Sequence, residues 1–235
     1  MIQSKNEKND WKKSKMIQIT NLTKKFGTAT VLDDINLTLE PGKIYGLVGR
    51  NGSGKTMLLK HMLGFVRPTE GTISYDGKLL WKDMEMPQQV GAIIESPGFL
   101  SEYSGFRNLQ LLAMIRGKIT DAQIRGAIAT VGLDPDSKKK VGSYSLGMRQ
   151  RLGIAQALME DPDILLLDEP LSGLDNDGVD EIRKVFLTQR EKGKTVVLAS
   201  HSNEDIAILC DEVFRFDKGK IIAHVVQGQE NLSEQ

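Results

Sequence analysis

The sequence of 235 residues predicts an α/β fold. Its sheet should be mainly parallel, with an antiparallel β layer at the N-terminal end and a helical subdomain inserted at about residues 96–150. Short, wholly apolar runs such as 164–167 alternate with helical segments, as the buried strands of parallel sheets do. Segments 16–22 and 35–39 instead alternate apolar and polar residues, which is typical of half-buried antiparallel strands.

Turn signals divide the chain into segments of strand or helix length. Asp76 with Gly77 is a hairpin turn signal, and Ser104 and Thr120 are suitable helix N-caps. The expected strands cover residues 16–22, 35–39, 43–48, 71–75, 90–94, 164–167, 194–199, 213–216 and 220–225. The expected helices cover residues 57–63, 104–116, 120–131, 146–159, 176–192 and 203–210.

Residues 49–56 read Gly-Arg-Asn-Gly-Ser-Gly-Lys-Thr, a complete G-x-x-x-x-G-K-[ST] pattern between a strand and a helix. Its glycines allow a tight turn that brings backbone N–H groups against a phosphate, and the following helix N-terminus favours an anion. Lys55 places a positive charge near the β- and γ-phosphates, and the Thr56 hydroxyl is a hard oxygen ligand for Mg²⁺. The expected nucleotide-binding residues are Gly49, Asn51, Gly52, Ser53, Gly54, Lys55 and Thr56.

Two carboxylates follow the apolar strand 164–167. Asp168 ends the strand at the sheet edge, where it could order the Mg²⁺ shell. Glu169 should face the opposite way, where it could orient or deprotonate an attacking water. A strand that simply ends in polar residues is the alternative, and the complete phosphate loop upstream makes that alternative weaker.

Ser145 and Gly147 open the helix expected at 146–159. A hydroxyl, backbone N–H groups and a helix dipole could meet a phosphate there, although an ordinary serine N-cap on an amphipathic helix is the favoured interpretation of this segment by itself.

Composition limits the possible partners. Lys plus Arg and Asp plus Glu both number 31, so nothing in the overall charge favours nucleic acid. Cys210 is the single cysteine, which excludes an internal disulfide framework and suits a reducing compartment. Because no apolar run approaches the roughly 20 residues that cross a bilayer, any membrane role should need a partner chain.

From about Met16 to Val226 the chain resembles the nucleotide-binding subunit of an ATP-binding cassette (ABC) transporter. The phosphate loop and Leu-Asp-Glu-Pro at 167–170 are the strongest marks. Leu-Ser-Gly-Leu-Asp at 171–175 matches the family's D-loop, and Ala-Ser-His at 199–201 matches its switch histidine. Lys-Phe-Gly at 25–27 matches the place where an aromatic ring stacks on adenine.

The resemblance implies a mechanism and a set of roles. Two cassettes, as a homodimer or a heterodimer, would sandwich two molecules of ATP with Mg²⁺. Phe26 would stack on adenine with Val31 packed nearby, and His201 would contact the γ-phosphate. The residues implied to act on the nucleotide of the other cassette are Ser145, Gly147 and Asp175.

Two places depart from the common family pattern. In the signature, usually Leu-Ser-Gly-Gly-Gln, Leu146 replaces the first glycine and Met148 replaces the glutamine. Glu95 stands where the Q-loop glutamine is usual. Its carboxylate could serve as a Mg²⁺ ligand, but it adds a negative charge near the γ-phosphate.

Both departures are similar to the bacitracin- and lantibiotic-type exporters and immunity systems. That subgroup implies export of a hydrophobic or amphipathic substrate, such as an antimicrobial peptide, through a separate permease. The cassette would then be cytoplasmic and peripheral on the inner face of the cell membrane. Segment 95–107, with Phe99, Tyr103 and Phe106, is a candidate docking surface for a permease helix, and an ordinary exposed loop is the alternative.

Two other functions remain as alternatives. A non-transport cassette acting on ribosomes or DNA would usually carry tandem cassettes or a long coiled coil, and this chain shows neither. A small-molecule kinase or GTPase could share the phosphate loop, but the chain has no Asn-Lys-x-Asp base-specificity motif. We expect residues 1–15 to be a disordered leader, 16–227 the ATPase domain and 228–235 a polar tail.

Overall fold

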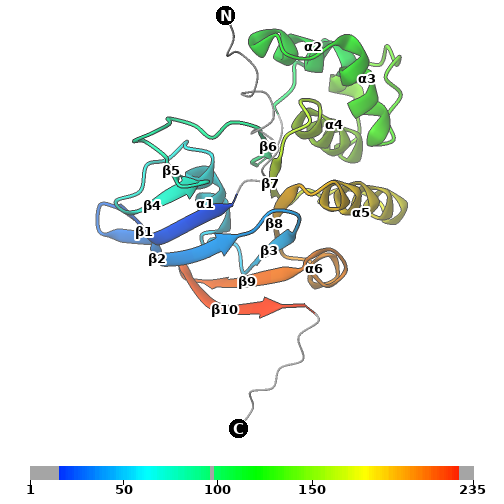
Figure 1. Cartoon of the computed structure of the whole chain (residues 1–235). Coiled ribbons are helices and arrows are strands. Elements are labelled where there is room, and N and C mark those ends of the chain that lie inside the picture. The colour runs from blue at the N-terminus through cyan, green and yellow to red at the C-terminus, as the bar shows by residue number, and fades with distance from the viewer. Residues whose placement is uncertain (1–15, 96–97, 228–235) are drawn as a thin grey trace, which may run out of the picture.

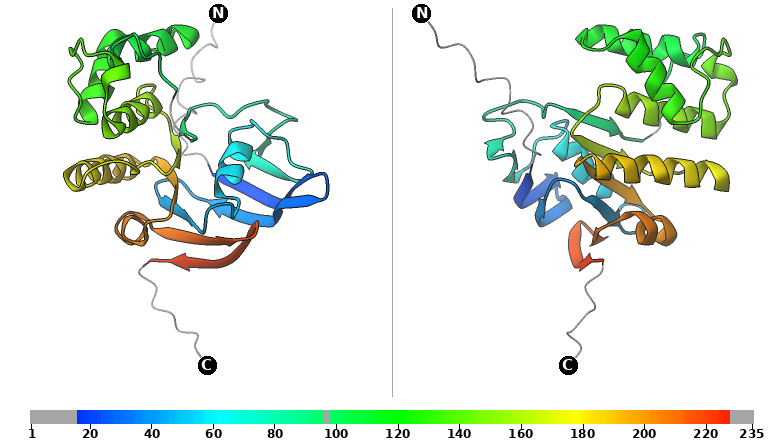
Figure 2. Two further views of the ribbon diagram at one scale, coloured as in Figure 1. Left: turned by 180° about the vertical axis from the view of Figure 1, so that it is seen from behind. Right: turned by 45° about the vertical axis from the view of Figure 1, so that its right-hand side comes forward.

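The computed structural model describes residues 16–95 and 98–227 (Figure 1). The expectations for residues 1–15 and 228–235 lie outside the described residues. Two sheets and a group of helices make up the described chain, and Figure 2 shows the helices α2 to α4 set apart from the antiparallel strands. No described helix has both the length and the apolar character that crossing a membrane requires.

The smaller sheet is antiparallel and comes mostly from the N-terminal part of the chain. Its strand order is β2-β1-β4-β5. The bounds are β1 Ile17–Phe26, β2 Ala29–Leu39, β4 Glu70–Tyr75 and β5 Lys78–Leu79. Strands β1 and β2 both run further than we predicted, because β1 continues past Leu22 through register shifts that break the alternation of buried and exposed residues.

The larger sheet carries the strands that end at the predicted site. Its order is β10-β9-β3-β8-β7-β6, and all neighbours pair in parallel except β10 with β9. The bounds are β3 Ile44–Val48, β6 Val90–Ile93, β7 Ile164–Asp168, β8 Thr195–Ser200, β9 Glu212–Asp217 and β10 Lys220–Val226. The predicted α/β class, with a mainly parallel sheet and an antiparallel layer, is confirmed.

The large sheet is buried on both faces, which explains its uninterrupted apolar strands. Leu165 and Leu167 of β7 belong to the core cluster that also contains the helical residues of α2 to α5. Ile164 and Leu166, which alternate with them, belong to the cluster shared with α1 and the antiparallel sheet. Because both faces need apolar side chains, the strand shows no polar alternation.

The helices lie close to their predicted positions, and their N-caps are as expected. Ser104 accepts a hydrogen bond from the backbone N–H of Arg107, and Thr120 forms a capping box with Gln123. Cys210 is buried directly after α6. The bounds are α1 Lys55–Met62, α2 Gly105–Arg116, α3 Asp121–Thr130, η2 (a 3₁₀ turn) Val141–Ser143, α4 Leu146–Leu158, α5 Asn176–Glu191 and α6 Asn203–Leu209.

Candidate active site

The phosphate loop joins β3 to α1 and wraps around its own lysine. Lys55 Nζ donates hydrogen bonds to the carbonyl oxygens of Gly49 at 2.7 Å and Arg50 at 3.3 Å. Gly54, the residue before α1, has φ of 110°, a conformation that strains any residue with a Cβ. The backbone N–H groups at the start of α1 have no partners within the helix, so they are available to an anion.

Close packing and an unpaired polar atom both suit this loop to phosphate. A Cβ on Gly49 would lie 2.4 Å from the carbonyl oxygen of Phe216, so only glycine fits against β9. Ser53 Oγ is buried and lacks a hydrogen-bond partner among the described residues. Since buried polar atoms are normally paired, this hydroxyl fits a ligand oxygen in the loop.

The loop opens into a cavity of about 360 Å³ that gathers most of the predicted nucleotide residues. Thr56 Oγ1 donates a 2.7 Å hydrogen bond to Asp168 Oδ2, so the ends of two elements 112 positions apart in sequence meet here. A hydroxyl beside a carboxylate is a hard oxygen donor set, which fits Mg²⁺. The lining residues are Val31, Asn51, Gly52, Ser53, Gly54, Lys55, Thr56, Met57, Lys60, Asp168 and Glu169.

The carboxylates of Asp168 and Glu169 contact different neighbours, as we predicted from their successive positions in the chain. Asp168 bonds to α1, whereas Glu169 Oε2 lies 2.9 Å from His201 Nδ1 in the loop after β8. Glu169 has φ of 46°, in the left-handed region that residues with a Cβ rarely adopt. The His201 ring is exposed, so the pair stands at the mouth of the site, where a water could reach Glu169.

Glu95 does not line the cavity in this structure. Its Oε1 accepts a 2.6 Å hydrogen bond from Lys60 Nζ, and Lys60 itself lines the cavity. Lys60 therefore places a positive charge beside the negative charge that Glu95 brings to the Q-loop position. Lys60 is not among the predicted site residues, although helical spacing places it one turn after Thr56 on the same face of α1.

Phe26 and Val31 lie at the tip and flank of the β1–β2 hairpin. Val31 lines the cavity, whereas Phe26 is half-exposed and is not one of its lining residues. Lys24 Nζ lies 4.7 Å from the centre of the Phe26 ring and so covers one ring face. Phe26 is 50% exposed, so part of its surface remains open to a ligand.

The signature and D-loop residues form a separate surface of the same chain. Ser145 Oγ accepts a hydrogen bond from the Met148 N–H and caps α4, while Asp175 caps α5 in the same way. A Cβ on Gly173 of the D-loop would lie 2.6 Å from Leu146 Cδ2, so the unusual leucine packs directly on this glycine. Neither Ser145, Gly147 nor Asp175 lines the cavity around the phosphate loop.

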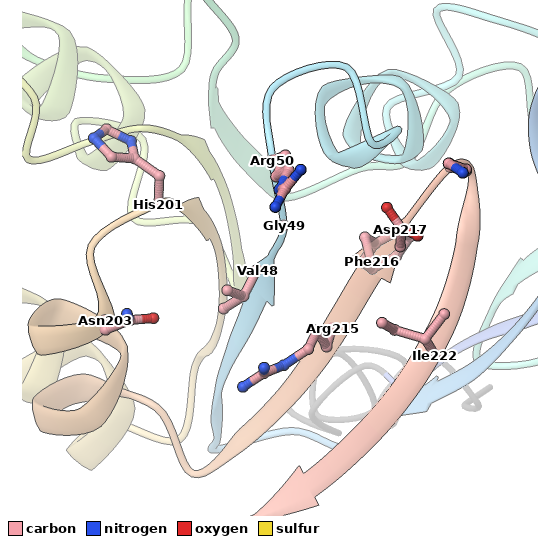
Figure 3. Close-up of a pocket in the computed structure, with 10 residues that line it drawn as sticks. Val48, Gly49, Arg50, His201, Asn203, Arg215, Phe216, Asp217 and Ile222 are labelled. Atoms are coloured by element: carbon pink, nitrogen blue, oxygen red, sulfur yellow. The ribbon is translucent and has the colours of Figure 1, made fainter.

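A second hollow of about 710 Å³ lies between the phosphate loop and β9. Figure 3 shows Arg50 at the loop, His201 after β8 and Arg215 on β9 around it. Arg50 and Arg215 are exposed, so the hollow presents positive charge at the carboxyl edge of the sheet.

The comparison with known proteins places this arrangement in a family. The model of the ABC transporter family matches residues 32–172, which is more than half of the chain. The chain belongs to the ABC transporter family. The predicted ATPase cassette is thereby confirmed.

Named relatives of this cassette include bacitracin and lantibiotic transport ATP-binding proteins. It is 47% identical over 206 residues to the uncharacterized ABC transporter ATP-binding protein YybJ of Bacillus subtilis, covering 88% of the cassette and 94% of that protein. It is 42% identical to the bacitracin transport ATP-binding protein BcrA of Enterococcus faecalis, covering 93% and 70% of the two chains. It is 36% identical to the lantibiotic transport ATP-binding protein SrtF of Streptococcus pyogenes, covering 93% and 95%. The predicted resemblance to this subgroup is confirmed.

A solved structure supports the fold of the cassette. The ATP-binding cassette MJ0796, a dimer in a post-hydrolysis state bound to ADP and phosphate, matches with a TM-score of 0.80 and 22% identity. The match covers 91% of this cassette and all of MJ0796.

Proposed function

We propose that this cassette binds Mg²⁺-ATP and hydrolyses it as one half of a two-cassette clamp. The observation that carries the proposal is the division of the predicted residues between two surfaces of one chain. The phosphate loop, Thr56, Asp168 and Glu169 share one cavity, while Ser145 and Gly147 lie outside it. A second cassette, either identical or a sibling, would supply the missing signature surface.

The residues of the cavity suggest how each cassette of the clamp works. Lys55 would turn from its own backbone carbonyls to the phosphates, and the buried Ser53 hydroxyl would gain a partner. Thr56 and Asp168 would hold Mg²⁺, which neutralises charge that develops on the phosphates. Glu169 would take a proton from the attacking water while His201 holds its carboxylate in place.

Contact with both cassettes explains how the nucleotide would drive movement. A ligand shifts a conformational equilibrium only by binding one state better, and a triphosphate gripped by two chains does so. The exposed Arg50 and Arg215 face outward at the sheet edge, whereas the D-loop side carries Asp175 and Asp177. These opposite charges favour a head-to-tail approach of two copies.

A groove on the surface of this cassette is the proposed docking site for a permease. It has a volume of about 760 Å³ and runs between the end of α1, the loop before β6, and helices α2 and α4. Phe65, Met86 and Ile115 line it and are 59%, 53% and 79% exposed. This mostly apolar groove fits an amphipathic helix from a membrane subunit.

This groove replaces part of the docking surface that we expected at 95–107. Phe99 and Phe106 are partly buried against the core, so they support the helical subdomain. Only Tyr103 of the three aromatic residues is substantially exposed, at 45%. Residues 96 and 97 lie outside the described residues.

The exported substrate is proposed from the subgroup. BcrA and SrtF are named for bacitracin and lantibiotic transport, and Glu95 and the altered signature resemble that subgroup. We therefore infer export of a hydrophobic or amphipathic peptide, with the cassette on the inner face of the cell membrane. Neither the family nor its named relatives favours the ribosomal, DNA, kinase or GTPase alternatives.

Substituting the proposed base tests hydrolysis and the clamp together. Glu169→Gln should reduce turnover at least about 100-fold, because the amide cannot accept the proton. It should also accumulate a dimer with Mg²⁺-ATP, measured by light scattering after size-exclusion chromatography. Glu191→Gln, at the exposed end of α5, is the matched control and should behave as wild type. Unchanged turnover in Glu169→Gln would remove Glu169 as the base.

Docking has a separate test. Ile115→Glu should weaken co-purification with the permease, because it places a charge in the apolar groove. Val225→Glu, on an exposed position of β10 outside the groove, should not. Equal recovery of the permease with both variants would contradict the assignment of this groove.

A further inference from the structure

Gln150 connects the signature helix, which is α4 beginning after Ser145, to the backbone of the proposed catalytic base. It lies in α4, and its side chain is almost fully buried. Its Nε2 donates hydrogen bonds to the carbonyl oxygens of Glu169 at 3.2 Å and Pro170 at 2.9 Å. The pattern that identifies the site gave no signal for this residue, because the contact spans about twenty positions.

The backbone that Gln150 contacts is in a conformation that must be held. Glu169 has φ of 46°, and such strained residues persist only where their surroundings fix them. The Glu169 N–H donates to Ala199 O at 2.9 Å, and its carbonyl accepts from the Ser172 N–H at 3.2 Å. Within the described residues, Gln150 is the one residue of α2 to α4 whose side chain donates a hydrogen bond to this turn.

The same helix begins at the signature residues, with Ser145 as its N-cap and Gly147 in its first turn. Gln150 lies five residues after Ser145, about 7.5 Å along a rigid helix. A displacement of the signature end would therefore reach the Gln150 amide with little loss. Leu146 is also packed on Gly173, so the signature and the turn after Glu169 touch at two points.

We propose that Gln150 is a positioning residue that couples the signature surface to the Glu169 carboxylate of its own chain. The proposal rests on the proposed function, in which the signature surface contacts the nucleotide of the other cassette. Engagement of that nucleotide would move α4, and Gln150 would transmit the movement to the backbone on which Glu169 stands. Each site would then respond to occupancy of the other.

The requirement is for a donor of this length. Both partners are carbonyl oxygens, so they need hydrogen-bond donors, and the amide NH₂ of glutamine carries two hydrogens for the two acceptors. Gln150→Met keeps the size and removes the donor, while Gln150→Asn keeps the amide and shortens its reach. Gln189→Met is the matched control, because Gln189 is also a buried helical glutamine but lies on α5.

The expected result is a change in turnover without a change in binding. Gln150→Met should lower kcat about 10- to 100-fold, since a small misplacement of a reacting group can cost on that order. Its KM for ATP should change less than about threefold, and the Hill coefficient for ATP should fall toward one. Gln189→Met should keep wild-type kcat, KM and Hill coefficient.

A double-mutant cycle separates positioning from general damage. If Gln150 acts through Glu169, adding Gln150→Met to Glu169→Gln should lower the residual rate less than twofold, although each single change is large. Unchanged kcat in a folded Gln150→Met, or fully additive losses, would overturn the proposal. If Gln150→Met does not fold, Gln150→Asn takes its place in the same assays. Failure of both to fold, judged by circular dichroism, would assign Gln150 to folding alone and also overturn it.

The same measurements distinguish this proposal from the proposed function. A wild-type chain without ATPase activity, or one insensitive to Glu169→Gln, would overturn both. A wild-type chain that depends on Glu169 but not on Gln150 would overturn only the coupling.

Discussion

Lys60 on α1 donates a 2.6 Å hydrogen bond to Glu95, the residue in the Q-loop position. Lys60 also lines the nucleotide cavity, so one cation lies between the Glu95 carboxylate and the expected place of the phosphates. An exposed ion pair contributes little to stability, typically below about 1 kcal/mol. Its effect should therefore appear in nucleotide affinity more than in folding.

Lys60→Met should weaken Mg²⁺-ATP binding about 3- to 10-fold, because it leaves the Glu95 charge uncompensated next to an anionic ligand. The double variant, Lys60→Met combined with Glu95→Gln, should recover most of the lost affinity for Mg²⁺-ATP. Titration with a fluorescent ATP analogue measures both. Lys78→Met, an exposed lysine on β5, is the control and should bind as wild type. Failure of the double variant to recover would show that Lys60 acts independently of Glu95.

The Thr56–Asp168 contact predicts how affinity depends on Mg²⁺. Chelation with EDTA should weaken ATP binding by wild type at least about tenfold, because the metal links these oxygens to the phosphates. Asp168→Asn should bind weakly with or without Mg²⁺, since an amide is a poorer ligand than a carboxylate. Isothermal titration calorimetry compares the two conditions. An Asp168→Asn protein that keeps the full response to Mg²⁺ would contradict the assigned ligand.

His61 predicts a loss of stability in mild acid. Its ring is completely buried in α1, with Nδ1 2.7 Å from the Met57 carbonyl oxygen and Nε2 without a partner among the described residues. Burial lowers the pKa of His61 below its ordinary value of 6.5. Below about pH 6.5 the unfolded chain therefore binds a proton that the folded chain does not, and the free energy of unfolding falls as pH falls.

His61→Leu should flatten this dependence. The variant removes both the titrating group and the unpaired nitrogen. As the pH is lowered from 7.5 to 5.5, the free energy of unfolding of His61→Leu should therefore increase by about 1 kcal/mol relative to that of wild type. Urea denaturation at the two pH values measures the change. Parallel curves for His61→Leu and wild type would show that His61 does not carry the acid sensitivity.

Gly91 marks a close approach between β6 and the signature helix. A Cβ there would lie 2.0 Å from the Ala157 carbonyl oxygen, so the sheet and α4 could not keep their spacing. Gly91→Ala should lower the free energy of unfolding by about 2–4 kcal/mol. Gly126→Ala is the control, because a Cβ there meets nothing within 4 Å and α3 should gain about 0.5–1 kcal/mol. Thermal unfolding measures both variants, and equal effects of the two substitutions would contradict the predicted clash.

Much of the site could be predicted because its signals are local. The phosphate loop is one continuous pattern, and Asp168 and Glu169 follow an apolar strand directly. A parallel strand that ends in acidic residues must bring them to the sheet edge where ligands bind. The fold class followed from the same periodicities, since a strand buried on two faces cannot alternate with polar residues.

Other features depend on contacts between distant segments. Lys60 and Glu95 are 35 positions apart, and Gln150 reaches carbonyl oxygens about twenty positions away. The aromatic Phe106 was expected on a docking surface but packs against the core.

The sequence alone determined which chemical groups this cassette carries and which strand or helix delivers them, because apolar periodicity and glycine-rich turns act over a few residues. Only the tertiary structure decided which groups meet, because burial and hydrogen-bond geometry depend on how the sheet, α1 and α4 pack. The charge partner of Glu95 and the amide that holds the turn after Glu169 belong to that second class.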